Sequence, residues 1–371
     1  MARGNDGLRL GMLVPSSNTC LEPVTYRLLG GVPEVTVHFA RVDVDQPSFG
    51  SRLGGEGMTT AAQQLAHAEV DAVVWNASSG SWLGVERDRE ICANLSRICG
   101  VPSTSTTLAL LEACRIYGVT NLGLATPYTA DVNVRIAAVY AEHGVEIVSE
   151  SHMGIEGNKA FARIPEDAVA AGVRAAASHA QAVTILCTNL HGASVAPILE
   201  AELGIPVFDS VAATLWQALQ LVAPTSLTGF GTLLQDGAFR SRLQALCDSL
   251  LRDTAADRTT LHLDIPERNL RGVLPVGESV GPGVRPIRSD ETNAPPGVNV
   301  AEWLEWSRRN LVDGIQSQIL EPVELDGALI GWLSAQSVSE RAWTKSSQGA
   351  MVAARQIAEE TVSSLTKPVR A

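Results

Sequence analysis

Short apolar runs alternate with longer Ala- and Leu-rich stretches between residue 8 and about residue 222. A strand that is buried on both faces reads as a continuous apolar run, and helices must cover both faces of a parallel sheet. The alternation therefore predicts an α/β fold with parallel strands. We expect these strands over residues 8–15, 35–42, 70–76, 121–127, 145–150, 182–188 and 205–210.

The same region contains an internal repeat. The segment around Pro15 matches the segment around Pro127 (127 − 15 = 112), and Asn76 matches Cys187 (187 − 76 = 111). A third correspondence follows in the same order, between the runs GVPSTS and GIPVFDS. Ordered matches at nearly constant offset predict two similar α/β halves.

We place the halves at residues 1–118 and 119–230 of one domain. In open parallel sheets the ligand lies beyond the carboxyl ends of the strands, so two halves that face each other form one cleft, with the active site between them. Four residues that close strands are expected to line this cleft: Pro15, Asn76, Pro127 and Cys187.

A different pattern follows a Pro-, Gly-, Ser- and Thr-rich stretch near residue 230. It predicts a separate α+β domain over residues 236–366. Asp326-Gly327 between two alternating runs indicates a hairpin turn. The expected order is helix 236–255, strand 259–265, a Gly/Pro-rich section to residue 297, helix 301–315, the hairpin, and helix 346–365.

Charge and hydropathy exclude several classes of protein. The formal net charge is 28 − 40 = −12, which disfavours a nucleic-acid partner. No run is long and apolar enough to span a membrane, so we expect no membrane partner. The six cysteines form no CxxC pair, and no apolar leader opens the chain, so we expect a cytoplasmic location. Lys159 is the single lysine before residue 230, which leaves little room for Schiff-base or Walker-type chemistry there.

Cys187 is the first candidate for catalysis, because it closes an expected strand and is followed by turn-forming residues. Backbone N–H groups at a helix start would lower the pKa of its thiol. A cysteine in a dry cleft can act as a nucleophile or as a proton donor. The alternative is a small apolar residue at a buried strand end. His191 either pairs with Cys187 or caps the following helix.

Three loops are rich in short hydrogen-bond donors, and the first and the third lie at the same point of the repeat. Such loops can hold a carboxylate without Lys or Arg, although the same residues can also cap helices. The candidate donors are Ser16, Ser17 and Asn18 in the first loop, Ser78 and Ser79 in the second, and Tyr128 in the third. The histidines lack metal-ligand spacing, and no glycine-rich nucleotide motif is present, so we expect no metal. The remaining cysteines are interpreted as residues on the buried faces of helices: Cys20, Cys92, Cys99, Cys114 and Cys247.

Five motifs between residues 7 and 223 resemble one known branch of enzymes. They are PSSNT at 15–19, the polar loop after VVWN, TPY at 126–128, GIEGN at 154–158 and LCTNL at 186–190. Together they resemble the maleate cis-trans isomerase and arylmalonate decarboxylase branch of the aspartate/glutamate racemase superfamily. The resemblance implies a two-half α/β fold, no cofactor, and a small dicarboxylate bound between the halves.

The resemblance also assigns roles to residues. It implies that Asn18, Tyr128 and Asn158 hold carboxylates and that Cys187 is the second-half cysteine, whereas Asn76 replaces the first-half cysteine of the isomerases. The decarboxylases also have only the second-half thiol, but their Gly-Thr-Ser and Cys-Gly-Gly patterns are replaced here. The substitutes are Asn76-Ala77-Ser78 and Cys187-Thr188-Asn189.

The C-terminal part resembles the end of a GAF domain, through its Asp-Gly hairpin, GWLS and RAWT. That resemblance implies a small-molecule sensing or dimerising module, and we expect a homo-oligomer. For the whole chain we expect a cofactor-independent isomerase or decarboxylase that acts on a maleate- or malonate-like compound. The alternatives are a non-catalytic binding protein and covalent hydrolysis of an amide or imide. The expected catalytic residues are Cys187 and Asn76, and the expected binding residues are Pro15, Ser16, Ser17, Asn18, Ser78, Ser79, Tyr128, Asn158, Thr188 and Asn189.

Overall fold

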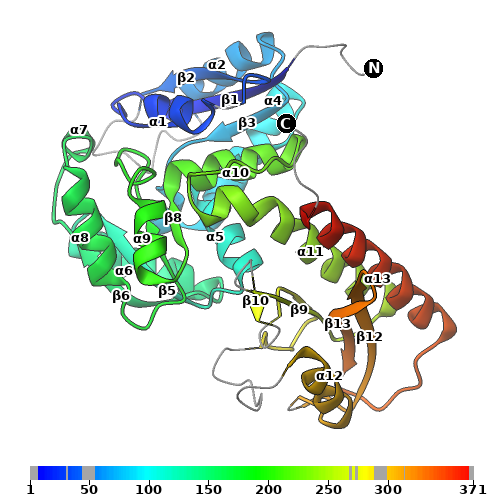
Figure 1. Ribbon diagram of the computed structural model, residues 1–371. Coiled ribbons are helices and arrows are strands. Elements are labelled where there is room, and N and C mark those ends of the chain that lie inside the picture. Colours follow the sequence, from blue (N-terminus) through cyan, green and yellow to red (C-terminus); the bar gives the residue numbers. More distant parts are fainter. Residues whose placement is uncertain are drawn as a thin grey trace. The chain divides into compact units, whose positions relative to one another are not determined.

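The chain forms two compact units in the computed structural model (Figure 1). One unit combines Met1–Arg115 with Val119–Ala238, and the other combines Ile116–Gly118 with Phe239–Ala371. The structure describes residues 7–30, 32–43, 55–266, 270–271, 275–287, 299–312 and 314–366.

The first unit begins with a four-stranded parallel sheet in the order β2-β1-β3-β4. Its strands are β1 (Leu8–Pro15), β2 (Val35–Val42), β3 (Ala72–Trp75) and β4 (Ser103–Ser105). The helices of this half are α1 (Leu21–Leu28), α2 (Glu56–His67), α3 (Gly80–Leu83), α4 (Val85–Cys99) and α5 (Thr106–Tyr117). Every residue of the central strand β3 is buried, as its continuous apolar sequence predicts.

A second parallel sheet in the same unit has the order β6-β5-β7-β8. Its strands are β5 (Asn121–Thr126), β6 (Glu146–His152), β7 (Ala182–Ile185) and β8 (Val207–Asp209). The helices are α6 (Ala130–Glu142), α7 (Asn158–Phe161), α8 (Glu166–Ala176), α9 (Ala196–Leu203) and α10 (Ser210–Val222). This order is that of the first sheet with every strand number raised by four, so the sequence repeat corresponds to two halves of the same topology. The prediction of two similar parallel-sheet halves is confirmed.

Glycine at one position lets a helix approach the second sheet. A Cβ atom on Gly123 in β5 would lie 2.1 Å from the carbonyl oxygen of Ala176, the last residue of α8. Only a residue without a side chain allows this separation. The close approach of α8 helps to hold β5, and therefore the loop that follows β5, in place.

The apolar-run pattern does not predict β4, whose sequence is Ser103-Thr104-Ser105. The strand is nevertheless paired in parallel with β3, and Ser105 is fully buried. The Ser105 hydroxyl donates to the Asp88 carboxylate at 2.6 Å, so hydrogen bonds replace apolar contacts at this edge. The sequence repeat contains the missing signal, because it aligns this segment with β8.

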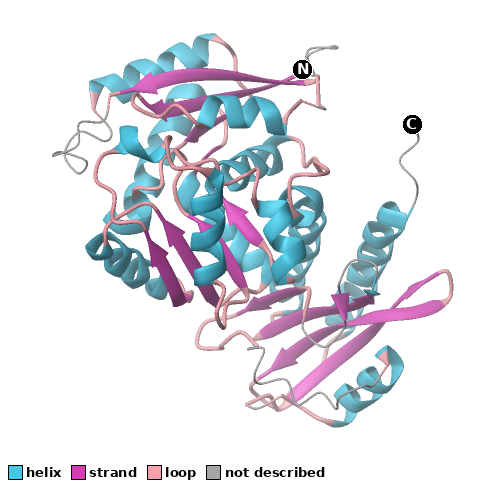
Figure 2. Cartoon of the chain, turned by 60° about the vertical axis from the view of Figure 1, so that its left-hand side comes forward, coloured by secondary structure: helices cyan, strands magenta, loops and turns pink. Residues whose placement is uncertain are grey.

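The second unit is built on a sheet of antiparallel strands in the order β10-β9-β13-β12, with β11 paired to β9 (Figure 2). The strands are β9 (Arg258–Ile265), β10 (Leu270–Arg271), β11 (Gly277–Val280), β12 (Ser317–Leu325) and β13 (Ala328–Ser337). The hairpin between β12 and β13 turns at Asp326 and Gly327, whose φ angles of 51° and 80° are those of the predicted tight turn.

Helices flank this sheet. They are α11 (Thr232–Thr254), α12 (Val300–Arg309) and α13 (Lys345–Thr366). Apolar residues of α11 and α13 pack with Leu261, Leu263 and Leu333 in one core cluster. The helix expected over 236–255 begins earlier, at Thr232, and the helix expected over 301–315 ends at Arg309. Part of the Gly/Pro-rich section, residues 288–298, lies outside the described residues. Among the described helices, none combines the length and the hydrophobicity that a membrane crossing requires.

Candidate active site

A cavity of about 300 Å³ lies in the first unit. Its lining comes from Pro15 at the end of β1, from the loops that follow β3, β5, β6 and β7, and from residues of α3, α6 and α7. Both halves therefore contribute to it, at the carboxyl ends of their strands, where parallel sheets bind ligands. The sequence-predicted residues that line it are Pro15, Ser78, Ser79, Tyr128, Asn158, Cys187 and Thr188.

Cys187 lies in this lining, two residues beyond the end of β7, and is 3% exposed. The backbone N–H of Asn189 donates to its sulfur at 3.4 Å, and the Tyr128 side chain also hydrogen-bonds to it. Burial outweighs both contacts and raises the pKa of the Cys187 thiol to about 12. The expected helix start is absent, because α9 begins only at Ala196. The expectation of a lowered thiol pKa is therefore wrong, and Cys187 is a protonated thiol at neutral pH.

Tyr128 connects Cys187 to a second hydroxyl. Its oxygen lies 2.8 Å from the Ser78 Oγ, in the loop after β3 of the other half. Burial raises the pKa of the Tyr128 phenol well above its usual value, so the group remains a hydrogen-bond donor. The Ser79 hydroxyl is also buried in the lining and has no hydrogen-bond partner among the described residues. The floor of the cavity thus presents a thiol and three hydroxyl groups.

One wall of the cavity is aromatic and aliphatic. The Tyr128 ring packs edge to face against Trp82, with ring centroids 5.0 Å apart, and against Phe161, at 5.5 Å. Val132 and Ile155 extend the wall. Sequence reasoning missed these apolar residues, because nothing in their sequence separates them from core residues. Trp82, Val132 and Phe161 lie three or four residues past a predicted site residue, and Ile155 lies three residues before Asn158, so this spacing could have indicated them.

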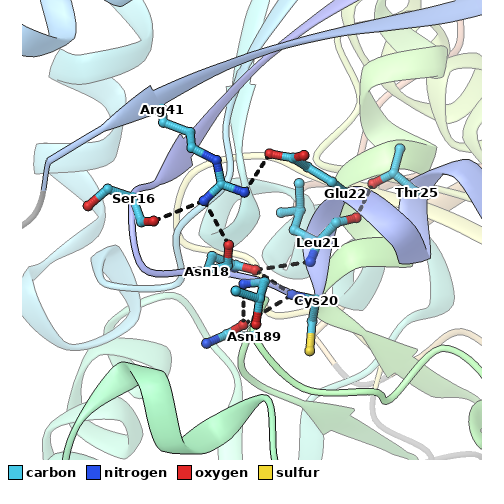
Figure 3. A network of polar contacts seen from close by, with 9 residues as sticks. Ser16, Asn18, Cys20, Leu21, Glu22, Thr25, Arg41 and Asn189 are labelled. Carbon is cyan, nitrogen blue, oxygen red and sulfur yellow. Dashed lines mark hydrogen bonds and ion pairs between the residues drawn. The ribbon is translucent and has the colours of Figure 1, made fainter.

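Asn18 holds a loop together instead of lining the cavity (Figure 3). Its Oδ1 accepts the N–H groups of Cys20 and Leu21, both at 3.0 Å, where the loop enters α1. Its Nδ2 donates to the Thr188 hydroxyl at 3.0 Å, next to Cys187. Asn18 thus orders the start of α1 and also positions the neighbour of the thiol.

Asn189 makes the complementary connection between the halves. Its Oδ1 accepts the N–H groups of Thr19 at 2.9 Å and Cys20 at 3.2 Å (Figure 3). Its Nδ2 donates to the Asn158 carbonyl oxygen at 2.7 Å. Asn189 is therefore a positioning residue and does not line the cavity.

Cys20 does not lie on the buried face of a helix, where the sequence predicts it. It is the N-cap of α1, and its sulfur lies 3.2 Å from the His191 Nε2. His191 thus contacts Cys20, and no contact with Cys187 is found among the described residues. Burial, together with the charge of Asp209, raises the pKa of Cys20 to about 11, so this thiol is not activated either.

Asn76 is buried beside the cavity but does not line it. Its amide nitrogen donates to the carbonyl oxygens of Leu13 and Val74, at 3.2 and 3.3 Å, while its Oδ1 has no hydrogen-bond partner among the described residues. Its backbone carbonyl accepts the Thr188 hydroxyl at 3.3 Å. The side chain thus braces the ends of β1 and β3, and Ala77 occupies the cavity wall instead.

The remaining predicted donors are divided between the surface and the rim. Ser16 is exposed and donates to Asp43 at 3.4 Å, away from the cavity lining. Ser17 accepts the Asn158 Nδ2 at 2.8 Å, which fixes the Asn158 carboxamide at the edge of the cavity. Pro127 is not among the lining residues, although its neighbour Tyr128 is. Within the described ranges, no cluster of three or more His, Cys, Asp or Glu side chains could hold a metal ion.

Asp209 places a buried carboxyl group near the thiols. Its Oδ1 caps α10 by accepting the N–H groups of Val211 and Ala212, both at 2.9 Å. Burial raises the pKa of Asp209 from 3.8 to about 7. Between those values the folded chain retains a proton that the unfolded chain releases, so the free energy of unfolding falls as the pH rises through this window.

We expect Asp209→Asn to weaken the dependence of the free energy of unfolding on pH, because the amide keeps the capping oxygen and cannot ionise. Thermal unfolding at about pH 5 and about pH 8 should show a larger gain in melting temperature for the variant at the higher pH. Asp131→Asn is the control, since Asp131 is exposed and its pKa is lowered by the Thr129 hydroxyl. An unchanged pH dependence in Asp209→Asn would contradict the assignment.

The fold and the cavity define a class of proteins. Its members have two parallel-sheet halves of one topology and a single cysteine in a pocket that both halves line. A family model described as arylmalonate decarboxylase matches residues 10–234, which is more than half of the chain. The chain belongs to the arylmalonate decarboxylase family.

Individual relatives agree with this assignment. The arylmalonate decarboxylase of Bordetella bronchiseptica is 27% identical over 233 residues, which cover 61% of this chain and 96% of that protein. A liganded mutant of arylmalonate decarboxylase is similar in structure, with 25% identity and a TM-score of 0.55 over 62% of this chain and 99% of that one. The maleate isomerase Iso from Pseudomonas putida S16 shares the fold, with 23% identity and a TM-score of 0.57 over 62% of this chain and 99% of that one.

Proposed function

We propose that this chain is a cofactor-independent decarboxylase that acts on a malonate carrying an aromatic or bulky apolar substituent. One observation carries the proposal: a single, protonated cysteine lies at the floor of a cavity that has an aromatic wall. Membership of the arylmalonate decarboxylase family supports the reaction class.

The protonation state of Cys187 favours decarboxylation over isomerisation. A nucleophilic step on a double bond needs a thiolate, whereas a pKa of about 12 keeps Cys187 as a thiol at neutral pH. A thiol is a suitable acid for a strongly basic enediolate. The position that holds a second thiol in the isomerases is occupied by Asn76, whose amide is bound to backbone carbonyls.

The hydroxyl groups supply the electrostatic part of the reaction. Loss of CO₂ from one carboxylate moves the electrons of the C–C bond into the remaining carboxylate, which becomes an enediolate. The hydroxyls of Tyr128, Ser78 and Ser79 lie in the lining and can donate to these oxygens. Cys187 then transfers its proton to the α carbon, and the resulting thiolate recovers a proton from water.

The apolar wall favours the substituent on the substrate. Trp82, Phe161, Val132 and Ile155 offer contact to a ring or a branched alkyl group. No Lys, Arg or His side chain lines the cavity among the described residues. Burial of an apolar substituent would place the departing carboxylate out of water, and this position favours its loss as neutral CO₂.

The test is an assay in D₂O with phenylmalonate, unsubstituted malonate and maleate, followed by NMR and by CO₂ release. We expect phenylmalonate to be converted to phenylacetate that carries one new deuterium at the α carbon, and to react faster than malonate. Conversion of maleate to fumarate without decarboxylation of either malonate would instead support an isomerase. Asn158, which lines the cavity with its amide, is the observation that favours this second candidate. Failure of every substrate would support a non-catalytic binding protein.

For the rest of the chain we propose a GAF-like module over residues 236–366, joined to a domain of residues 1–230 whose halves meet near residue 118. The antiparallel sheet, the terminal helices α11 and α13 on one face, and the Asp326-Gly327 hairpin support this proposal.

A further inference from the structure

The second unit contains its own cavity, of about 470 Å³, which lies within the range of sites for small molecules. One face of the sheet formed by β9, β13 and β12 provides its floor, and α12 and the segment around Val284 provide further lining. Figure 1 shows α12 beside the hairpin of β12 and β13. The opposite face of the same sheet packs against α11 and α13 in the apolar core. The cavity is therefore separate from the core of the unit.

The strands of this sheet place buried polar side chains along the floor of the cavity. In β9 the residues that face the cavity are Arg258, Thr260 and His262, and the intervening Leu261 faces the core. Each of the three polar residues is at most 7% exposed. Buried polar side chains cost free energy unless they have partners, so a row of them along a cavity indicates a binding surface and not a packing surface.

The neighbouring strand continues the pattern in register. Ser334 lies opposite Thr260 with their hydroxyls 2.7 Å apart, and Gln336 lies opposite Arg258. At one end of the cavity floor, therefore, a guanidinium group lies beside a carboxamide, and the pair of hydroxyls follows next to them. At the other end, His262 stacks on Trp332 with ring centroids 4.6 Å apart.

The aromatic end is extended by α12. Trp303 packs edge to face on Trp332 and stacks with Trp306, and all three line the cavity. The indole N–H of Trp303 is buried and has no acceptor among the described residues.

The charges of the lining have one sign. Arg258 and Arg285 both contribute to it, and no Asp or Glu is among the described lining residues. Arg258 is buried and forms an ion pair with Glu278, 3.3 Å away, which compensates part of its charge, and it donates to the Gln336 carboxamide oxygen at 3.4 Å. Arg285 is exposed at the rim. A guanidinium is well suited to a carboxylate.

We propose that this cavity binds an aromatic monocarboxylate, with its ring at Trp332 and its carboxylate toward Arg258 and Arg285. The assignment rests on the second unit alone. An acid of the same class is what decarboxylation of an aryl-substituted malonate would release, so the module would respond to the product of the first unit if the proposed function holds.

The test is calorimetric titration of the full chain with 3-phenylpropionate, its neutral amide, and 3-cyclohexylpropionate. Arg285→Gln and Thr260→Val alter the cavity, with Arg309→Gln and Thr259→Val as matched controls. Arg309 is an exposed residue of α12 outside the lining, and Thr259 faces the opposite side of β9, where it donates to the Cys247 carbonyl. Val132→Trp fills the cavity of the first unit and leaves the second unit untouched.

We expect the aromatic acid to bind the wild type and Val132→Trp alike, and the amide and the cyclohexyl acid to bind more weakly. Each cavity variant should raise the Kd about tenfold, while its control should not. The proposal is overturned if no acid binds at millimolar concentration, if the amide binds as well as the acid, or if Val132→Trp alone abolishes binding. Arg285→Gln keeps the test decisive should Thr260→Val fail to fold, because Arg285 is exposed. Phenylmalonate turnover is measured separately, so failure of this site and failure of the proposed activity remain distinguishable.

Discussion

Replacement of Cys187 by alanine is expected to lower kcat for phenylmalonate by about 10²–10⁴-fold, the range that a positioned general acid contributes. The other acidic side chains among the described lining residues are the Tyr128 phenol and Glu156, which is exposed. Without the thiol the enediolate must wait for a proton from water, which the apolar wall excludes. Substrate binding should persist, because the hydroxyl donors remain. Initial rates and calorimetric titration with phenylmalonate measure the two effects.

Cys114→Ala is the matched control. Cys114 is also fully buried, and burial raises the pKa of its thiol to about 12, but it lies in α5 outside the cavity lining. Equal loss of activity in the two variants would show that the effect is structural and would contradict the role of Cys187. Full activity in Cys187→Ala would exclude the thiol as the acid.

Local sequence patterns predicted most of the first unit because its inner strands β1, β3, β5 and β7 are largely buried and are apolar in sequence. The expected strand at 8–15 coincides with β1, and that at 35–42 coincides with β2. The errors lie where polar side chains are buried with partners. β4 is a run of hydroxyl residues bonded to Asp88, and the run 182–188 stops as a strand at Ile185 because the chain turns before Cys187.

The candidate site could be located from the sequence but not resolved residue by residue. The repeat identified the strand ends, and the cavity lies there. The asparagines of these loops nevertheless diverge: Asn158 lines the cavity, whereas the Asn18 Oδ1 accepts backbone N–H groups of its own half and the Asn189 Oδ1 accepts backbone N–H groups of the other half. The direction of a side chain depends on loop dihedral angles that tertiary contacts set. The pKa of Cys187 likewise depends on burial, which a strand-end motif does not specify.

Loss of the Tyr128 hydroxyl is expected to have the second-largest effect. Tyr128→Phe removes a donor aimed at the cavity floor and keeps the ring between Trp82 and Phe161. Removal of one preorganised donor to a developing oxyanion costs about 10²–10³ in kcat. The Michaelis constant should change little, because the ground-state carboxylate is less basic than the enediolate. The variant also deprives Cys187 of a hydrogen bond that lowers its pKa, so the thiol stays protonated.

Tyr140→Phe supplies the comparison. Tyr140 is fully buried in α6, with its hydroxyl 3.5 Å from Ser81, and it is not a lining residue. Its variant should unfold at a temperature near that of Tyr128→Phe and keep kcat near the wild-type value. A similar fall in kcat for both variants would assign the effect to lost packing. A fall confined to Tyr128→Phe, with kcat and not the Michaelis constant affected, places the hydroxyl at the enediolate, because only a donor that acts in the transition state separates the two constants.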